Sequence, residues 1–99
     1  MGRLEEDIRS LGNRSATIVR KLRKAHVRGV IDQCFDDPVS MWLEGRGWHN
    51  CALGGDEWVA YRNDFVEYDE CEPVPAAQEF LHRFDRGEYP DLVCAKRAR

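Results

Sequence analysis

Apolar residues recur at helical spacing near the start of the chain. Over 16–28, Ile18 and Leu22 fall on one side of a helical wheel, and the basic residues fall on the other side. Ser15 is a suitable N-cap for this segment, and Gly29 is a suitable C-terminal stop. The pattern therefore predicts an amphipathic helix that docks on a core by its apolar stripe.

Two further helices are indicated by a proline at their first position. Pro38 follows two aspartates and precedes an apolar run to Leu43, and the helix is expected to end at Gly45 or Gly47. Pro75 opens a longer segment whose apolar residues repeat at helical spacing and which stops before Gly87. We expect a short helix from Pro38 and a longer helix over 75–86.

The chain between these two helices has the pattern of β-strands. Strands are expected over 48–53, 57–62 and 65–68, joined by two-residue turns at Gly54-Gly55 and Asn63-Asp64. Pairing across these turns gives an antiparallel meander with two sets of facing residues. One face carries Trp48, Ala52, Val59, Tyr61, Val66 and Tyr68, and the other carries His49, Cys51, Leu53, Trp58, Ala60 and Phe65.

Together these segments predict an α+β fold with the order α-α-β-β-β-α. Two N-terminal helices, a three-stranded antiparallel meander and a C-terminal helix would place all helices on one side of a small sheet. A length of 99 residues allows a single domain. We expect this domain over 15–93, a mobile or partly helical arm over 1–14, and a basic, disordered tail over 94–99.

Charge is divided unevenly along the chain. Residues 1–33 carry eight Lys/Arg against four Asp/Glu, whereas 34–93 carry four Arg against fourteen acidic residues. An uneven charge distribution of this kind affects which partners a protein attracts, but it does not determine the fold. No apolar run approaches the roughly 20 residues of a membrane span, and residues 1–8 do not resemble a signal peptide. We therefore expect a soluble cytoplasmic protein without a membrane partner.

Four cysteines and three histidines raise the question of a metal site. The cysteines are 17, 20 and 23 residues apart, without the CxxC pairs that structural zinc sites use. The weak zinc candidates are His49, Cys51, Cys34 and Cys71. With no secretory signal, reduced thiols are expected rather than disulfides. The sequence thus predicts neither a bound metal nor a cofactor.

The sequence contains no motif with a catalytic mechanism. It has no GxGxxG or Walker A pattern and no nucleophile elbow. Gly54-Gly55 lies in a predicted hairpin, not between a strand and a helix, so it does not form a phosphate cradle. We therefore expect a non-catalytic protein.

Five basic residues on the predicted 16–28 helix suggest contact with a phosphate backbone. They are Arg20, Lys21, Arg23, Lys24 and Arg28. However, Asp36 and Asp37 stand where a recognition helix would approach DNA, and carboxylates repel phosphate. The sequence favours a solvated face that balances the acidic body, with a nucleic-acid-binding module as the alternative.

One face of the predicted sheet gives the most specific indication of binding. The candidate protein-binding residues are the apolar Leu53, Trp58 and Phe65 and the acidic Asp56, Glu67 and Asp69. An apolar centre inside a charged rim is typical of protein interfaces, and Trp is a favoured anchor. The same apolar residues would belong to the core if a helix covered this face, and both interpretations stay open. The sequence predicts a small protein-binding factor, and a homodimer is also compatible with this face.

The stretch from Cys34 to Val93 resembles a group of small uncharacterised proteins of actinobacteria and their phages. The resemblance lies in Cys34, Pro38, Met41-Trp42-Leu43, Gly54-Gly55, Phe80 and the segment 84–93. Members of this group more often have a second cysteine beside the proline, where this chain has Asp37. The resemblance implies no activity. It suggests a phage accessory or host-modulating factor whose partner is a host protein.

Overall fold

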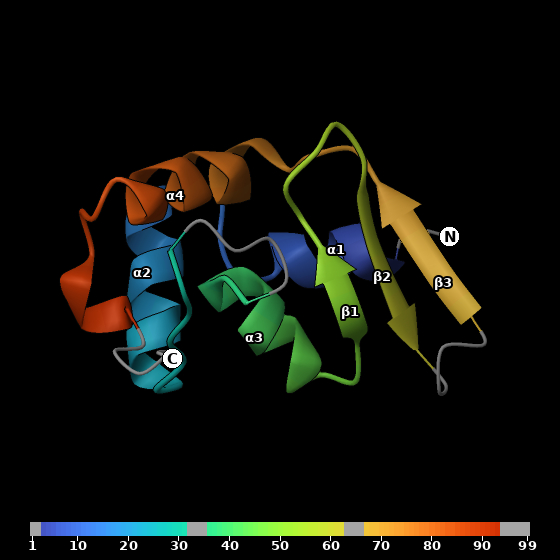
Figure 1. The fold of residues 1–99 in the computed structure, drawn as a ribbon, viewed down its shortest axis with the longest axis horizontal. Helices are drawn as coiled ribbons and strands as arrows, with labels where there is room; N and C mark the ends of the chain where they lie inside the picture. The colour runs from blue at the N-terminus through green and yellow to red at the C-terminus, as the bar shows by residue number, and fades with distance from the viewer. Residues whose placement is uncertain (1–2, 32–35, 63–66, 94–99) are drawn as a thin grey trace.

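The computed structural model describes residues 3–31, 36–62 and 67–93 (Figure 1). The elements are α1 (Arg3–Arg9), α2 (Ser15–Lys24), α3 (Pro38–Glu44), β1 (His49–Ala52), β2 (Trp58–Arg62), β3 (Glu67–Cys71), α4 (Pro75–Asp85) and the 3-10 helix η1 (Pro90–Leu92). The strands form one antiparallel sheet in the order β1-β2-β3. The predicted α+β class is confirmed, with one more helix before the sheet than expected. In the described part of the chain, no helix has the length and apolar character needed to cross a bilayer.

Helix α1 lies in the segment 1–14, for which a mobile or partly helical arm was expected. Leu4 and Ile8, one turn apart, and Leu11 just after the helix all have 0% exposure. The backbone N–H of Leu4 donates to Oδ2 of Asp69 in β3 at 3.0 Å, which ties the start of the helix to the sheet. The expected arm over 1–14 thus contains a helix, and this helix packs into the core.

Helix α2 ends earlier than predicted. It stops at Lys24, and His26 just beyond it has a φ of 60°. A residue in this left-handed conformation interrupts a right-handed helix. The predicted stop, Gly29, has a different role. A Cβ atom at this position would collide with the backbone of Asp37 and Pro38, so glycine lets the chain pass close to the start of α3.

The two helices that begin with proline lie where they were expected. Asp37 caps α3, since its carboxylate accepts hydrogen bonds from the Ser40 backbone N–H at 2.8 Å and the Ser40 hydroxyl at 3.0 Å. Gly87, with a φ of 83°, follows the end of α4. These boundaries were predictable because capping and proline signals are local.

The pairing of β1 with β2 contains a bulge that the two-residue-turn prediction did not include. His49 pairs with Tyr61 and Ala52 with Val59, so one extra residue lies in β1 between these pairs. Asn50, inside this stretch, has a φ of 48°. Because of the extra residue, the side chains that precede the bulge in β1 point to the opposite face of the sheet from the one predicted. As a result Trp48 is buried, and the predicted assignment of Trp48 and His49 to their faces is wrong.

The pairing of β2 with β3 differs from the prediction by two residues. Arg62 pairs with Glu67 and Tyr61 with Tyr68, so β3 starts later than the predicted strand over 65–68. A shift of two leaves Tyr68 on its expected face, together with Tyr61. The predicted turn at Asn63-Asp64 lies outside the described residues.

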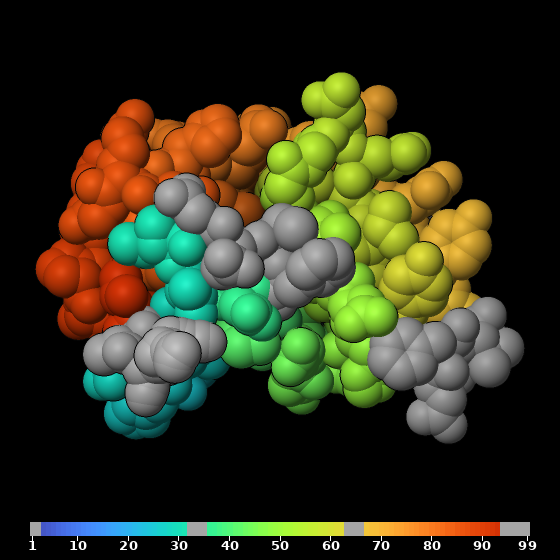
Figure 2. Space-filling view, viewed as in Figure 1, coloured from blue at the N-terminus to red at the C-terminus, as the bar shows by residue number. Residues whose placement is uncertain are grey.

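The sheet has an inner face that belongs to the core and an outer face. The inner face carries Cys51, Leu53, Trp58 and Ala60, which are at most 4% exposed. Figure 1 shows α1 behind the strands, α3 beside β1, and α2 next to α4 at the other end of the molecule. The outer face, which faces the viewer, has side chains of all three strands at the surface with no described helix in front (Figure 2).

Candidate binding surfaces

The predicted interface anchors Leu53 and Trp58 are core residues. Their exposed fractions are 4% and 1%, so the expectation that they lie near the surface is wrong. Helix α1 lies behind the strands on this side of the sheet, and its Leu4 N–H donates to Asp69 in β3 (Figure 1). Phe65, the third predicted anchor, lies outside the described residues.

The structure separates the three predicted acidic rim residues. Asp56 is exposed in the connection between β1 and β2, and Glu67 is exposed at the start of β3. Asp69 is directed to α1: its Oδ2 accepts from the Leu4 N–H and its Oδ1 from the Glu70 N–H at 2.9 Å. A carboxylate that accepts these two bonds holds the helix in place, so Asp69 has a structural role.

The outer face of the sheet carries two neighbouring tyrosines. It is formed by His49, Ala52, Val59, Tyr61, Tyr68 and Glu70, as the strand register shows. Tyr61 and Tyr68 are cross-strand partners with ring centroids 5.8 Å apart. Among the large hydrophobic side chains of the described residues, Tyr68 alone is largely exposed, at 61%. The sequence analysis had placed these two tyrosines on one face but had not chosen that face for binding.

Acidic side chains gather at one end of this outer face. Glu70 pairs with Val59 on the face itself. Glu57 and Glu72 extend β2 and β3 beyond the last pair of the sheet, so they lie at the same end, and all three glutamates are exposed. The negative electrostatic potential of these glutamates, next to Tyr61 and Tyr68, favours partners with positive charge.

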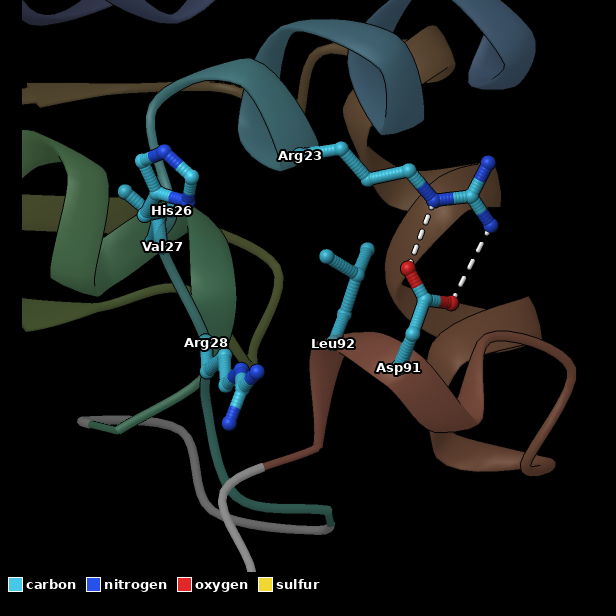
Figure 3. Close-up of a pocket in the computed structure, with 6 residues that line it drawn as sticks. All are labelled: Arg23, His26, Val27, Arg28, Asp91 and Leu92. Atoms are coloured by element: carbon cyan, nitrogen blue, oxygen red, sulfur yellow. Dashed lines mark hydrogen bonds and ion pairs between the residues drawn. The ribbon is translucent and has the colours of Figure 1, made fainter.

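The predicted nucleic-acid face is partly engaged in contacts within the protein. Arg23 holds Asp91 through two bonds, Nε to Oδ2 at 2.6 Å and Nη2 to Oδ1 at 3.1 Å (Figure 3). This pairing raises the pKa of Arg23 and lowers the pKa of Asp91. Lys21 donates from Nζ to the carbonyl oxygen of Ser10.

Arg28 is separated from the other basic residues of this predicted face. Arg20, Lys21, Arg23 and Lys24 share α2, whereas Arg28 lies beyond the helix end, on the chain that leads away from it (Figure 3). A pocket of about 410 Å³ lies at this place, lined by Arg23, His26, Val27, Arg28, Asp91 and Leu92. The positive charge available for a phosphate backbone is therefore smaller than the sequence suggests.

The zinc candidates are not gathered in the part of the chain that the structure describes. No group of three or more His, Cys, Asp or Glu residues within 3–31, 36–62 and 67–93 is placed to hold a metal. Because of the bulge, His49 is exposed on the outer face whereas Cys51 is buried on the inner face. Cys34 lies outside the described residues.

The two described thiols are poor nucleophiles. Burial raises the pKa of Cys51 to about 12 and that of Cys71 to about 11. Since the thiolate is the reactive and metal-binding form, both groups stay in the unreactive thiol form at neutral pH.

Comparisons with known proteins do not assign a function to these surfaces. No protein-family model matches the chain, and no match was found among curated proteins or solved structures. A functional proposal therefore depends on the geometry of the surfaces themselves.

Proposed function

We propose that the protein is a non-catalytic factor that binds another protein through the outer face of its sheet. The observation that carries this proposal is the Tyr61–Tyr68 pair, with Tyr68 61% exposed on a face that no described helix covers. Tyrosine offers a large contact area and a polar hydroxyl, and it is enriched at the centres of protein interfaces.

The partner is proposed to be a protein with a basic surface. Glu57, Glu70 and Glu72 place negative charge beside the tyrosines, and lysine or arginine side chains on the partner would complement it. The same charge disfavours nucleic acid at this face, because phosphates carry the same sign as the carboxylates. The phage accessory or host-modulating role is supported by the sequence resemblance alone and forms part of the same proposal.

The nucleic-acid alternative relies on the basic residues of α2. Two of its five residues, Lys21 and Arg23, already bind oxygen atoms of the protein itself. This observation favours the outer face of the sheet as the binding surface.

Photo-crosslinking from a single position tests the proposed surface. A benzophenone amino acid at position 68 is expected to capture one defined protein from lysate, whereas the same group at position 82, exposed on α4, is expected not to capture it. The captured protein, once purified, should bind the wild-type chain, carry a basic surface, and bind more weakly as salt screens the glutamates.

Two results of this experiment would contradict the proposal. Equal capture from positions 68 and 82 would show that the crosslinks are non-specific. Capture of a second copy of this chain from position 68 would instead assign the outer face to a homodimer.

A further inference from the structure

Three arginines from three separate elements meet at one pocket. Arg3 in α1, Arg46 after α3 and Arg62 at the end of β2 line a space of about 500 Å³. The rest of the lining consists of Glu6, Asp7 and Gly45, so every side chain in it is charged. A pocket with this lining suits a small charged ligand rather than an apolar one. We call it the arginine pocket.

Two of these arginines are held against tryptophan rings. Cζ of Arg46 lies 4.8 Å from the centroid of the Trp42 ring, and Cζ of Arg62 lies 4.5 Å from that of the Trp48 ring. A guanidinium group that is attracted to an aromatic ring can still direct N–H groups toward a ligand oxygen. Such contacts also reduce the conformational freedom that the side chains lose when they bind an anion.

The carboxylates of the pocket do not cancel its positive charge. Asp7 accepts a hydrogen bond from Nε1 of Trp48 at 2.8 Å, and its other oxygen lies 3.5 Å from Nη2 of Arg46. Asp7 therefore fixes the ring against which Arg62 lies. With Glu6, the lining has two carboxylates against three guanidinium groups, so the pocket is net positive.

We propose that the arginine pocket binds a small molecule through a diphosphate group. Guanidinium groups contact phosphate oxygens in pairs of charge-assisted hydrogen bonds, and three of them can meet the several oxygens of two linked phosphates. Arg3 and Arg62 also line a smaller neighbouring pocket of about 190 Å³, together with Trp48, Tyr68, Glu67 and Asp69. Because Glu67 and Asp69 repel phosphate, this neighbouring pocket would take an uncharged or cationic part of the ligand.

Titration with inorganic pyrophosphate tests this site. Calorimetry and tryptophan fluorescence should both show saturable one-site binding, because Trp42 and Trp48 lie against the binding arginines. Arg46→Gln and Arg62→Gln are each expected to weaken binding about tenfold or more, since each removes a charge-assisted contact. Arg86→Gln is the matched control, because Arg86 pairs with Glu88 at 3.0 Å and does not line the pocket.

A further variant and a second ligand distinguish diphosphate binding from the alternative explanations. Arg3→Gln, at an exposed position, replaces Arg62→Gln if loss of the Trp48 contact unfolds the protein, and it is expected to weaken binding in the same way. No saturable binding by the wild type, or equal weakening in Arg86→Gln, would overturn the proposal. Binding of a single-stranded oligonucleotide without binding of pyrophosphate would overturn it as well, since it would indicate a nucleic-acid surface.

Discussion

Replacing Trp58 with alanine is expected to lower the free energy of unfolding by about 3–5 kcal/mol, the usual cost of removing a large buried aromatic side chain. Trp58 is 1% exposed on the inner face of the sheet and belongs to the hydrophobic core. Truncation removes apolar contacts and leaves a cavity that the surrounding core fills only in part. Urea unfolding followed by far-UV circular dichroism measures the loss, and Trp58→Phe is a milder variant for the same measurement.

Tyr68→Ala is the matched control for this prediction. Tyr68 lies on the outer face and is 61% exposed, so its truncation is expected to change the unfolding free energy by less than about 1 kcal/mol. Similar losses in Trp58→Ala and Tyr68→Ala would mean that the two faces of the sheet are assigned wrongly.

The protein is expected to lose stability as the pH rises from about 4 to about 8, because of Asp37. Burial raises the pKa of this carboxyl from 3.8 to about 7, although the bonds from Ser40 act in the opposite direction. The unfolded chain releases this proton near pH 4, whereas the folded protein keeps it until about pH 7. Between about pH 4 and pH 7 the folded state therefore binds more protons than the unfolded chain. Its free energy of unfolding falls over this range by at most about 4 kcal/mol.

Asp37→Asn tests the origin of this pH dependence. The amide oxygen still accepts the bond from the Ser40 N–H but has no charge to bury, so the variant is expected to lack most of the decline. Asp91→Asn is the control, because the Arg23 pairing lowers the pKa of Asp91 and gives a contribution of the opposite sign. Urea midpoints at several pH values provide the measurement. A decline that persists unchanged in Asp37→Asn would assign it to other groups.

The sequence predicted elements whose signals are local. Asp37 and Pro38 mark the start of α3, and Pro75 and Gly87 bound α4, because caps and prolines act within a few residues. Helix α1 carries no comparable signal. Its seven residues are too few for a stable isolated helix, and it depends on burial of Leu4 and on other long-range contacts.

The sequence left open whether a helix covers the face of Leu53 and Trp58, and the structure shows both side chains buried. The alternation of side chains between the two faces of a strand correctly grouped Leu53 with Trp58 and Tyr61 with Tyr68. This pattern could not show which of the two faces a helix covers. The bulge at Asn50 was equally hidden, since a non-glycine residue with positive φ leaves little trace in the sequence.

The arginine pocket could not be predicted from spacing along the chain. Arg3, Arg46 and Arg62 lie on three elements that come together only through the packing of α1 and α3 on the sheet. The tryptophan partners, Trp42 and Trp48, read in the sequence as ordinary apolar residues of a helix and a strand.

The affinity of the purified partner for Tyr68→Ala is the most direct test of the proposed protein-binding face. We expect a loss of about tenfold or more relative to the wild type, as truncation of an interface anchor gives, and an unchanged affinity for His82→Ala on α4. Circular dichroism should show that both variants are folded. Equal affinities of the wild type and Tyr68→Ala for the partner would contradict the account.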